Sequence, residues 1–565
     1  MLKTILQNAL QITDARNRRA CGTWKSYLML CALISVVLLS ALVARAQQVA
    51  NHGTPDHSLE QRRSLHIVQQ DVAIAEILQG LRKDALHGLI MFRNVRVIDP
   101  VAETASAAQT LIVSDDRIAW IGDRANEPRV RQTAKEVDGS GLYIAPGLAD
   151  MHVHTSSSAA WLLDIANGVT TVREMAGFPW MLEARDKIKS GLMLAPWLAV
   201  AGPLINNFGL EGYAVVVKDP LDGRRSVRQQ AACGYDFIKV WNIVPEPIFD
   251  AVADQARLEG MDLIGHVPQG ISLQHAVQMG MRTMEHLKGF INDATLKRGE
   301  TDYSSLAGKD VWNTPTLYAG RDAARGQEAQ TYLNSSEMQY VPRRRIDRWN
   351  QLVTKPDEPV DQLRRNARTI MKDIVRELHA THAHFLAGTD SDDYPFQVAG
   401  FGLLDELRLL QDAGLSAAEA FRAATTEAAS AMREPEEFGR IRNGMRADFV
   451  LLDSNPLNDL SAFRRNRGVM VHGFWLSRDR LEPALEKLAH TYAERDEDTL
   501  FSQNAARSTL EAAESLVNTG FVLDSQELME LVRYLREAGY GAEANRLETI
   551  ASIPKNGPCA EPRPE

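Results

Sequence analysis

Eight short apolar runs alternate with stretches of helical character between residues 149 and 390. Strands joined by helix-length connections lie parallel in one sheet, because a tight hairpin joins only antiparallel strands. Eight is the number of strands that closes a (β/α)8 barrel, so we predict an α/β fold of the TIM-barrel type. The expected strands are Ala149–His154, Gly168–Glu174, Trp197–Ala201, Phe237–Trp241, Asp262–His266, Arg282–His286, Val311–Thr316 and His384–Asp390.

The regions on either side of these runs predict additional domains. Short apolar runs broken by turn residues favour strands at residues 88–145 and 436–478. We expect these two flanks to form one composite β-sandwich domain beside a barrel domain that spans residues 146–435. Residues 47–87 have the pattern of an N-terminal helical lead, and residues 479–565 that of a helical C-terminal extension.

The start of the chain has the features of a secretory signal peptide. Basic residues precede an apolar run from Tyr27 to Val43, and Ala44 and Ala46 supply the small side chains of a cleavage site. We therefore expect residues 1–46 to be removed and the protein to be exported, either periplasmic or secreted, with no stable membrane span afterwards. The alternative is an N-terminal membrane anchor, because the run approaches the lower length limit of a spanning helix.

The charge of the chain limits its partners. The formal net charge is -10, and the apolar content of 45% is that of a soluble globular protein. Nucleic acids and anionic membrane surfaces are bound by basic faces, so neither is expected as a partner. A small molecule or a dipeptide is expected instead, and a homo-oligomer is left open.

Two histidines one residue apart end the first expected strand. Side chains at positions i and i+2 of a strand point to the same face, so His152 and His154 can converge on one metal ion. Taken alone, the pair is weak evidence, because two polar residues that leave a strand give the same pattern.

Four further candidate ligands stand at or near the ends of later strands, namely Lys239, His266, His286 and Asp390. The carboxyl ends of the strands form the active face of such a barrel, which favours one shared site. A buried ammonium is costly, whereas the carbamate that an amine forms with carbon dioxide is an anion able to bridge two cations. Singly, Lys239 can extend to the barrel rim and either histidine can be a core residue. Jointly, we interpret the set as a metal site.

The chain resembles the amidohydrolase superfamily over residues 88–478. It is most similar to the binuclear imidazolonepropionase-like and Xaa-Pro dipeptidase-like amidohydrolases, whose composite β-sandwich the two flanks also resemble. The stretches that carry the resemblance are Ala145–His154, Asn167–Arg173, Phe237–Val240, Gly265–Pro268, Glu285–Leu287, Gly388–Asp390 and Gly444–Val450.

This resemblance implies a binuclear metal centre. One ion would be held by His152, His154 and Asp390, the other by His266 and His286, and a carbamate on Lys239 would bridge both. Mixed nitrogen and oxygen donors accept several metals, so we expect two divalent ions, zinc first, with manganese, cobalt or iron as alternatives.

Two departures from the family pattern narrow the activity. Imidazolonepropionases are mononuclear and lack the bridging lysine, so Lys239 argues against that activity. Carboxypeptidase-like members grip a substrate carboxylate with a basic segment after strand five, whereas this chain has His266-Val-Pro-Gln-Gly270 with no cation. That mode of substrate capture is therefore in doubt.

The expected chemistry is hydrolysis of an amide bond in a dipeptide or an N-acyl amino acid by a metal-bridging hydroxide. Two divalent ions lower the pKa of water from about 15.7 towards about 7. Asp390 would accept the proton of this water and pass it to the departing amine. Alternatives are hydrolysis of a cyclic amide or lactone, deamination of a ring, and a non-catalytic binding protein on the same barrel.

Three more residues are candidates for substrate contacts. Arg173 at the end of the second strand either meets a substrate carboxylate or pairs with Glu174 or Asp150. Tyr213 and Tyr235 either donate a hydrogen bond to the oxyanion or take part in packing.

Overall fold

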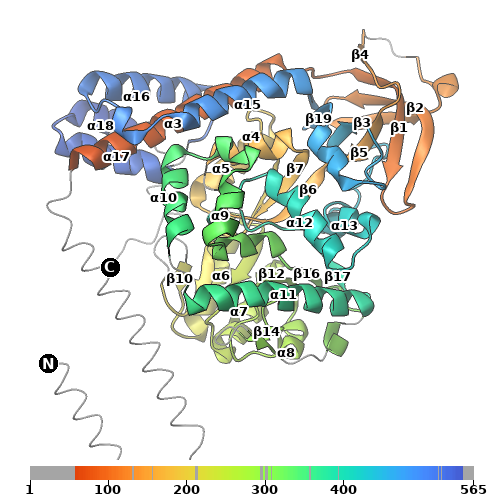
Figure 1. Ribbon diagram of the computed structural model, residues 1–565, viewed down its shortest axis with the longest axis horizontal. Helices are drawn as coiled ribbons and strands as arrows, with labels where there is room; N and C mark the ends of the chain where they lie inside the picture. Colours follow the sequence, from red (N-terminus) through yellow and green to blue (C-terminus); the bar gives the residue numbers. More distant parts are fainter. Residues whose placement is uncertain are drawn as a thin grey trace, which may run out of the picture. The chain divides into compact units, whose positions relative to one another are not determined.

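The computed structural model describes most of the chain beyond residue 56 (Figure 1). Nearly all of the described chain falls in one compact unit, residues 61–565, and of residues 1–60 only the first turn of one helix is described. The signal peptide predicted for residues 1–46 therefore lies outside the described residues. The described ranges are 57–129, 133–155, 157–209, 214–292, 297–299, 303–306, 308–355, 358–391, 394–519, 521–523 and 525–550.

Parallel strands form two sheets in the region predicted as a barrel. The first sheet has the order β6-β7-β8, and the second has the order β10-β9-β11-β12-β13-β16-β17. The bounds are β6 Leu148–Val153, β7 Val169–Glu174, β8 Trp197–Val200, β9 Leu204–Asn206, β10 Ala214–Val216, β11 Phe237–Val240, β12 Asp262–Gly265, β13 Met281–Glu285, β16 Trp312–Thr314 and β17 His384–Phe385. Each of the eight predicted strands has a counterpart here, so the prediction of an α/β fold is confirmed.

The assigned ladders do not form one closed ring of eight strands. Single bridges span the two gaps, Ala201 with Phe237 and Val153 with Ser391. Beyond β17 the chain runs beside β6, where Met151 N donates to Ala387 O at 2.9 Å and Asp390 N donates to His152 O at 2.7 Å. The segment after β17 is therefore held by backbone bonds next to the strand that carries the two histidines.

Two strands of the parallel sheets were not predicted. β9 and β10 have three residues each and follow β8 in the chain. They pair with each other, and β9 also meets β11 at Val240. Runs this short, broken by Gly202 and Pro203, give no period that distinguishes a strand from a loop.

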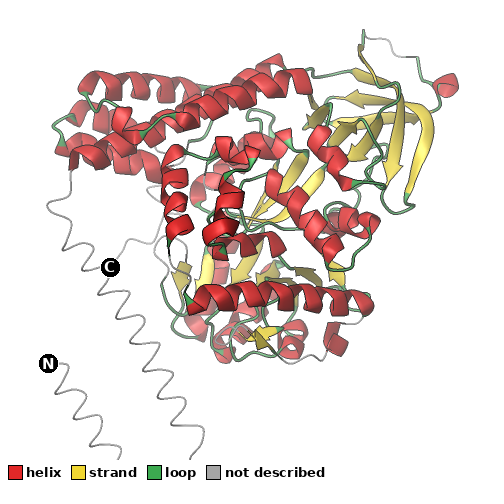
Figure 2. Cartoon of the chain, viewed as in Figure 1, coloured by secondary structure: helices red, strands yellow, loops and turns green. Residues whose placement is uncertain are grey.

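Helices connect the strands, as Figure 2 shows. α6 illustrates why they begin and end where they do: Asp219 accepts from the first-turn amides, Pro220 opens the helix, and Gly234 ends it with a left-handed backbone. Helices α7 and α8 follow β11 and β12, and the long connection before β17 holds α9, α10 and α11. The bounds are α4 Ser158–Ala166, α5 Pro179–Lys189, α6 Pro220–Cys233, α7 Glu246–Glu259, α8 Leu273–Gln278, α9 Gly326–Leu333, α10 Arg343–Thr354, α11 Pro359–Ala380 and α12 Phe401–Asp412.

One mixed sheet contains strands from both flanks. Its order is β20-β19-β18-β5-β1-β2-β3, with β4 paired to β1, and β5 joins the flanks because it pairs with β18. Phe92, Phe449 and Trp475 pack edge to face in its core, with ring centroids 5.1 and 4.9 Å from Phe92. The sandwich arrangement and the domain boundaries stay predictions. The bounds are β1 Ile90–Asp99, β2 Thr104–Ser114, β3 Arg117–Gly122, β4 Lys135–Asp138, β5 Tyr143–Pro146, β18 Phe449–Leu452, β19 Gly468–Val471 and β20 Phe474–Ser477.

The N-terminal helix α3 (His57–Asp84) contacts the C-terminal helices. Gln69 Nε2 donates to Thr509 Oγ1 at 3.1 Å, and Gln70 Nε2 donates to Thr491 O at 3.1 Å. The C-terminal helices are α15 (Arg478–Ala493), α16 (Gln503–Asn518), α17 (Ser525–Glu537) and α18 (Gly541–Ile550). In the part of the chain that the structure describes, none of the helices is both long and apolar enough to span a membrane.

Replacing Phe449 by alanine tests whether the two flanks share one core. Phe449→Ala should lower the free energy of unfolding by about 3–5 kcal/mol, because it leaves a cavity beside Phe92. Urea unfolding followed by circular dichroism measures the change. Leu258→Ala, at a side chain that is 65% exposed, is the control and should change it by less than about 0.5 kcal/mol. A loss below about 1 kcal/mol for Phe449→Ala would contradict a shared core.

Candidate metal centre

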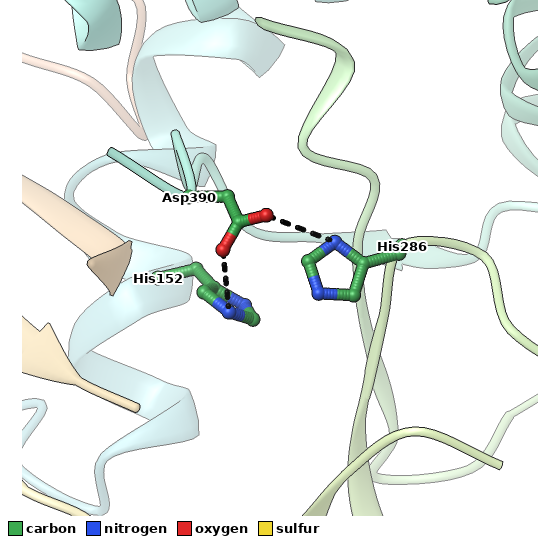
Figure 3. Close-up of side chains that lie close together, drawn as sticks. All are labelled: His152, His286 and Asp390. Carbon is green, nitrogen blue, oxygen red and sulfur yellow. Dashed lines mark ion pairs between the residues drawn. The ribbon is translucent and has the colours of Figure 1, made fainter. Parts of the chain in front are cut away.

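The six predicted ligands come together at one end of the parallel strands. His154, Lys239, His266, His286 and Asp390 line one pocket of about 580 Å³. His152 lies beneath them and is 0% exposed. Figure 3 shows the carboxylate of Asp390 between the rings of His152 and His286. His152 belongs to β6, His286 directly follows β13, and Asp390 lies in the segment after β17.

Asp390 is the common neighbour of three imidazoles. Its Oδ1 lies 3.3 Å from the Nε2 atoms of both His152 and His154, and its Oδ2 lies 3.9 Å from Nδ1 of His286. Asp390, His286 and Thr316 all have a left-handed backbone, with φ of 59°, 58° and 50°. Such strained positions in residues other than glycine concentrate at functional sites, where the surrounding structure holds them in place.

Oxygen acceptors orient the histidine rings from outside. His152 Nδ1 lies 2.8 Å from Glu285 Oε2, and His266 Nδ1 lies 2.6 Å from Asn242 Oδ1. Such bonds leave the other ring nitrogen of each histidine directed towards the interior, as is usual for metal-binding histidines. Among the described residues, His266 Nε2 is buried without a hydrogen-bond partner.

The donor set fits divalent metal ions. Ligand atoms of His152, His286 and Asp390 all lie within 4.8 Å of one another. Imidazole nitrogens together with a carboxylate suit zinc, and also manganese, cobalt and iron. A buried imidazole nitrogen without a protein partner is a costly arrangement that a bound ion would relieve.

Lys239 lies inside the site. It belongs to β11, is 1% exposed, and its Nζ lies 3.3 Å from Nε2 of His152. Burial lowers its pKa to about 8, although Asp390 and Glu285 act in the opposite direction. More of its amine is therefore neutral near neutral pH than in an exposed lysine.

The charges around Asp390 favour its ionised form. Burial acts to raise the pKa of this carboxyl, but the charges of His286 and His152 and the bond from His154 outweigh it, and the pKa is lowered. Burial lowers the pKa of His152 and His266 well below the ordinary value. Burial also lowers the pKa of His286 to about 4, whereas the bond and charge of Asp390 outweigh burial at His154 and raise its pKa. The site thus combines an ionised carboxylate with three imidazoles whose pKa is lowered, and neutral imidazole and ionised carboxylate are the forms that bind metals.

Of the three predicted substrate contacts, the two that the structure describes, Arg173 and Tyr235, do not line the pocket. Arg173 is 1% exposed, and it donates from Nη2 to Glu285 Oε1 at 2.9 Å and from Nε to Met151 O at 2.7 Å. It therefore pairs within the protein, with Glu285 instead of the expected Glu174 or Asp150. Tyr235 lies before β11, at the end of that strand away from the pocket, and Tyr213 lies outside the described residues.

Sequence reasoning missed the residues that position the ligands. Glu285, Asn242 and Thr316 contact the rings of His152, His266 and His286. A signal existed for Glu285, because a carboxylate inside a buried strand requires a cationic partner and Arg173 has the same need. No local pattern marks Asn242 or Thr316, which lie in loops after their strands.

Replacing Arg173 distinguishes a structural pair from a substrate contact. Arg173→Met should lower the free energy of unfolding by about 3–5 kcal/mol, because it leaves Glu285 buried without its guanidinium. Thermal and urea unfolding measure the loss, with Arg257→Met, at a side chain that is 71% exposed, as the matched control. Unchanged stability combined with a raised KM would instead indicate a substrate contact.

Comparison with curated proteins finds hydrolytic relatives with partial coverage. A dihydroorotase from Solibacter usitatus is 43% identical over 65 residues, 12% of this chain and 14% of the relative. An adenine deaminase from Geobacillus kaustophilus is 25% identical over 358 residues, 60% of this chain and 51% of the relative. The chain thus spans about half the length of the deaminase and a much smaller share of the dihydroorotase. An ochratoxinase from Aspergillus niger is 21% identical over 425 residues, 64% of this chain and 80% of the relative.

Solved structures of similar fold cover more of the chain. A bottromycin amidohydrolase is 25% identical with a TM-score of 0.62, and the match covers 74% of this chain and 93% of that protein. A Xaa-Pro dipeptidase with methionine in its active site is 19% identical with a TM-score of 0.54, and the match covers 69% of this chain and all of that protein. Because the dipeptidase is only 19% identical, its similarity shows a shared fold and nothing more.

The sequence profile of the amidohydrolase family matches residues 143–476, which is more than half of the chain. The match covers all six strand-end residues and nearly all of the second flank, but only residues 143–145 of the first. The resemblance inferred from the strand ends is confirmed, and the chain belongs to the amidohydrolase family.

Proposed function

We propose that this enzyme hydrolyses the amide bond of a small substrate that carries a carboxylate, such as a dipeptide or an N-acyl amino acid, with two divalent metal ions. The observation that carries the proposal is the convergence of four histidines, a lysine and an aspartate at one 580 Å³ pocket. We also propose that the two parallel sheets, joined by the Val153–Ser391 and Ala201–Phe237 bridges, are the parts of one (β/α)8 barrel.

The metal assignment is the one that the family resemblance implies, and distances within the site support parts of it. His152 and His154 share Oδ1 of Asp390, which supports one ion held by these three residues. His266 and His286, whose ring centroids are 4.8 Å apart, would hold the second ion. Bound ions of this kind supply Lewis acidity, which lowers the pKa of water and polarises a carbonyl group.

Lys239 would serve as the bridge between the two ions as a carbamate. Its side chain is buried among the histidines, and an ammonium there would face costly desolvation. In the reaction with carbon dioxide, the amine nitrogen bonds to the carbon and loses a proton, which leaves one negative charge on two oxygens. That anion replaces a cation next to His152 with a group suited to hold cations.

Asp390 would transfer the proton during hydrolysis. Its carboxylate faces the pocket, and the bond from its own N–H to His152 O fixes the main chain beneath it. Water adds to the amide carbon, its proton goes to the carboxylate, and the same proton reaches the departing nitrogen as the carbon–nitrogen bond breaks. An amine leaves readily only when it is protonated, so this step governs turnover.

The pocket wall suggests how the substrate carboxylate is held. Arg364 and Arg368 of α11 line the pocket together with Lys288. Arg368 uses Nη1 for Glu328, at 2.6 Å, while its Nε and Nη2 atoms have no partner among the described residues. These two atoms form the edge of a guanidinium that binds a carboxylate in a bidentate manner. We propose that Arg368 replaces the basic segment that this chain lacks after His266.

A second candidate function is the opening of a cyclic amide or the deamination of a ring. The matches to proteins named dihydroorotase and adenine deaminase favour it. A cyclic or ring substrate has less need of a carboxylate contact, so the two candidates differ in their dependence on α11.

Amine release tests the proposed reaction and the role of Asp390. The enzyme, loaded with zinc in bicarbonate, should cleave linear dipeptides or N-acyl amino acids from a panel that also contains lactams, lactones and adenine. Asp390→Asn should lower kcat/KM by about 10²–10⁴-fold, because the proton transfer is lost. Asp373→Asn, on an exposed face of α11, is the control. Turnover of cyclic substrates alone would favour the second candidate, and a near-normal rate in Asp390→Asn would overturn the role of Asp390.

Carbon-13 NMR tests the carbamate on Lys239. Enzyme loaded with metal in ¹³C-bicarbonate should give one protein-bound carbamate signal, and Lys239→Met should abolish it and reduce the bound metal. Lys187→Met removes a lysine from the last turn of α5 and should leave both readouts unchanged. A wild-type enzyme with two bound ions and no carbamate signal would refute the bridging role.

Substrate pairs that differ only in their carboxylate test Arg368. Arg368→Met should raise KM for a free acid by about 10–100-fold, because a charge-assisted bidentate contact contributes about 1.5–3 kcal/mol. The corresponding amide or ester should be nearly unaffected. Arg376→Met on the same helix, at a side chain that is 58% exposed, is the matched control. An equal increase in KM for the free acid and the ester would show that Arg368 does not bind the carboxylate.

A further inference from the structure

A second cavity, of about 260 Å³, lies away from the candidate metal centre, and none of the six metal-site residues lines it. Its walls come from four helices, α3, α4, α10 and α15, and from the segment that precedes α12. The proposed hydrolysis gives this cavity no role.

The cavity has an excess of positive charge. Arg63, Arg344, Arg345 and Arg348 line it, and Asp71 is the one carboxylate among its lining residues. Arg344 donates to Gln70 Oε1 at 2.6 Å, and it forms no ion pair with any carboxylate in the described part of the chain. In a chain with a net charge of -10, four arginines around one small cavity are an unusual concentration of cations.

The start of α10 adds to this positive charge. The first turn of α10 holds Arg343, Arg344 and Arg345 and no acidic residue, and Pro342 gives no side-chain cap. A helix N-terminus carries partial positive charge, so acidic residues are favoured there and cations are repelled. Basic side chains at this end of a helix are unfavourable for the helix itself, and an anion bound there would offset that cost.

The start of α4 borders the same cavity. Ser157 precedes this helix of nine residues but does not cap it, and its Oγ instead lies 3.3 Å from the hydroxyl of Tyr492. The first turn of α4 contains no acidic residue. Two helix N-termini that are not capped by side chains therefore border the cavity, an arrangement that favours a bound anion.

Gln397 provides an independent indication of a ligand. It lines the cavity and is 1% exposed, and neither its amide nitrogen nor its amide oxygen has a hydrogen-bond partner among the described residues. Leaving a buried amide without partners is costly, and such groups are uncommon in folded proteins. The amide offers both a donor and an acceptor to whatever fills the cavity.

We propose that this cavity is a second ligand site, which binds a small organic anion through a carboxylate or phosphate group. The arginines and the two helix N-termini would contact the anionic group, and Gln397 would bond a neighbouring hydroxyl, amide or acid group. Ala160, Leu163 and Val398 add a small apolar wall. The volume lies just below the usual range of roughly 300–1,000 Å³ for ligand pockets, which limits the ligand to a small metabolite.

Calorimetric titration of the full-length, metal-loaded enzyme tests this site. The probes are inorganic phosphate and succinate, at an ionic strength held constant with chloride. At least one probe should bind saturably, and the stronger one identifies the phosphate or the carboxylate class. Arg344→Gln and Gln397→Leu should each weaken binding by at least about tenfold. Arg343→Gln removes the same charge from the same helix turn but does not line the cavity, and it should change binding by less than about twofold.

Three results would overturn the proposal. The first is that neither probe saturates, and the second is that Arg343→Gln weakens binding as much as Arg344→Gln. The third is that binding vanishes when the metal is removed, which would place the anion at the other pocket. Hydrogen exchange on the wild-type enzyme does not depend on the folding of a variant. Saturating probe should slow exchange at residues 343–348 and 397–401 relative to chloride, and unchanged exchange there would also contradict the site.

Discussion

The candidate centre depends on one buried carboxylate, Glu285. Its side chain is 0% exposed, and burying an ionised carboxylate is costly unless every oxygen is bonded. Arg173 and Thr283 donate to Oε1, and Oε2 lies against Nδ1 of His152. These bonds connect β7, β13 and β6, so the position of the His152 ring is fixed by residues from other strands.

Other buried polar groups around the site are held by hydrogen bonds in the same way as Glu285. Burial makes each polar group require a partner, and each partner then restricts the group that it bonds. Asn242 and Thr316 fix two more rings, while the main chain at Asp390 is tied to His152. Rings that are held from outside keep their other nitrogen directed to the interior. The protein thus supplies a preorganised set of donors, which is the property that a hydrolytic metal centre requires.

Local sequence patterns predicted the eight strands and the polar residues at their ends that come together at the pocket. The runs that end in His154, His266 and His286 have an apolar period and a polar terminus, and both signals lie within a few residues. The partners of Arg173 could not be read in the same way, because Glu285 lies 112 residues away and the fold alone brings them together. The contact between Gln69 of α3 and Thr509 of α16 is also invisible locally, since each helix shows an apolar face but not which surface covers it.

Crystals grown with zinc and bicarbonate would test the central claim most directly, by anomalous diffraction at the zinc edge. The account predicts two anomalous peaks in the pocket, one beside His152, His154 and Asp390 and the other beside His266 and His286. Density for three extra atoms should extend from Nζ of Lys239 between them. A single peak, or two peaks with an unmodified Lys239, would contradict the binuclear centre with a bridging lysine.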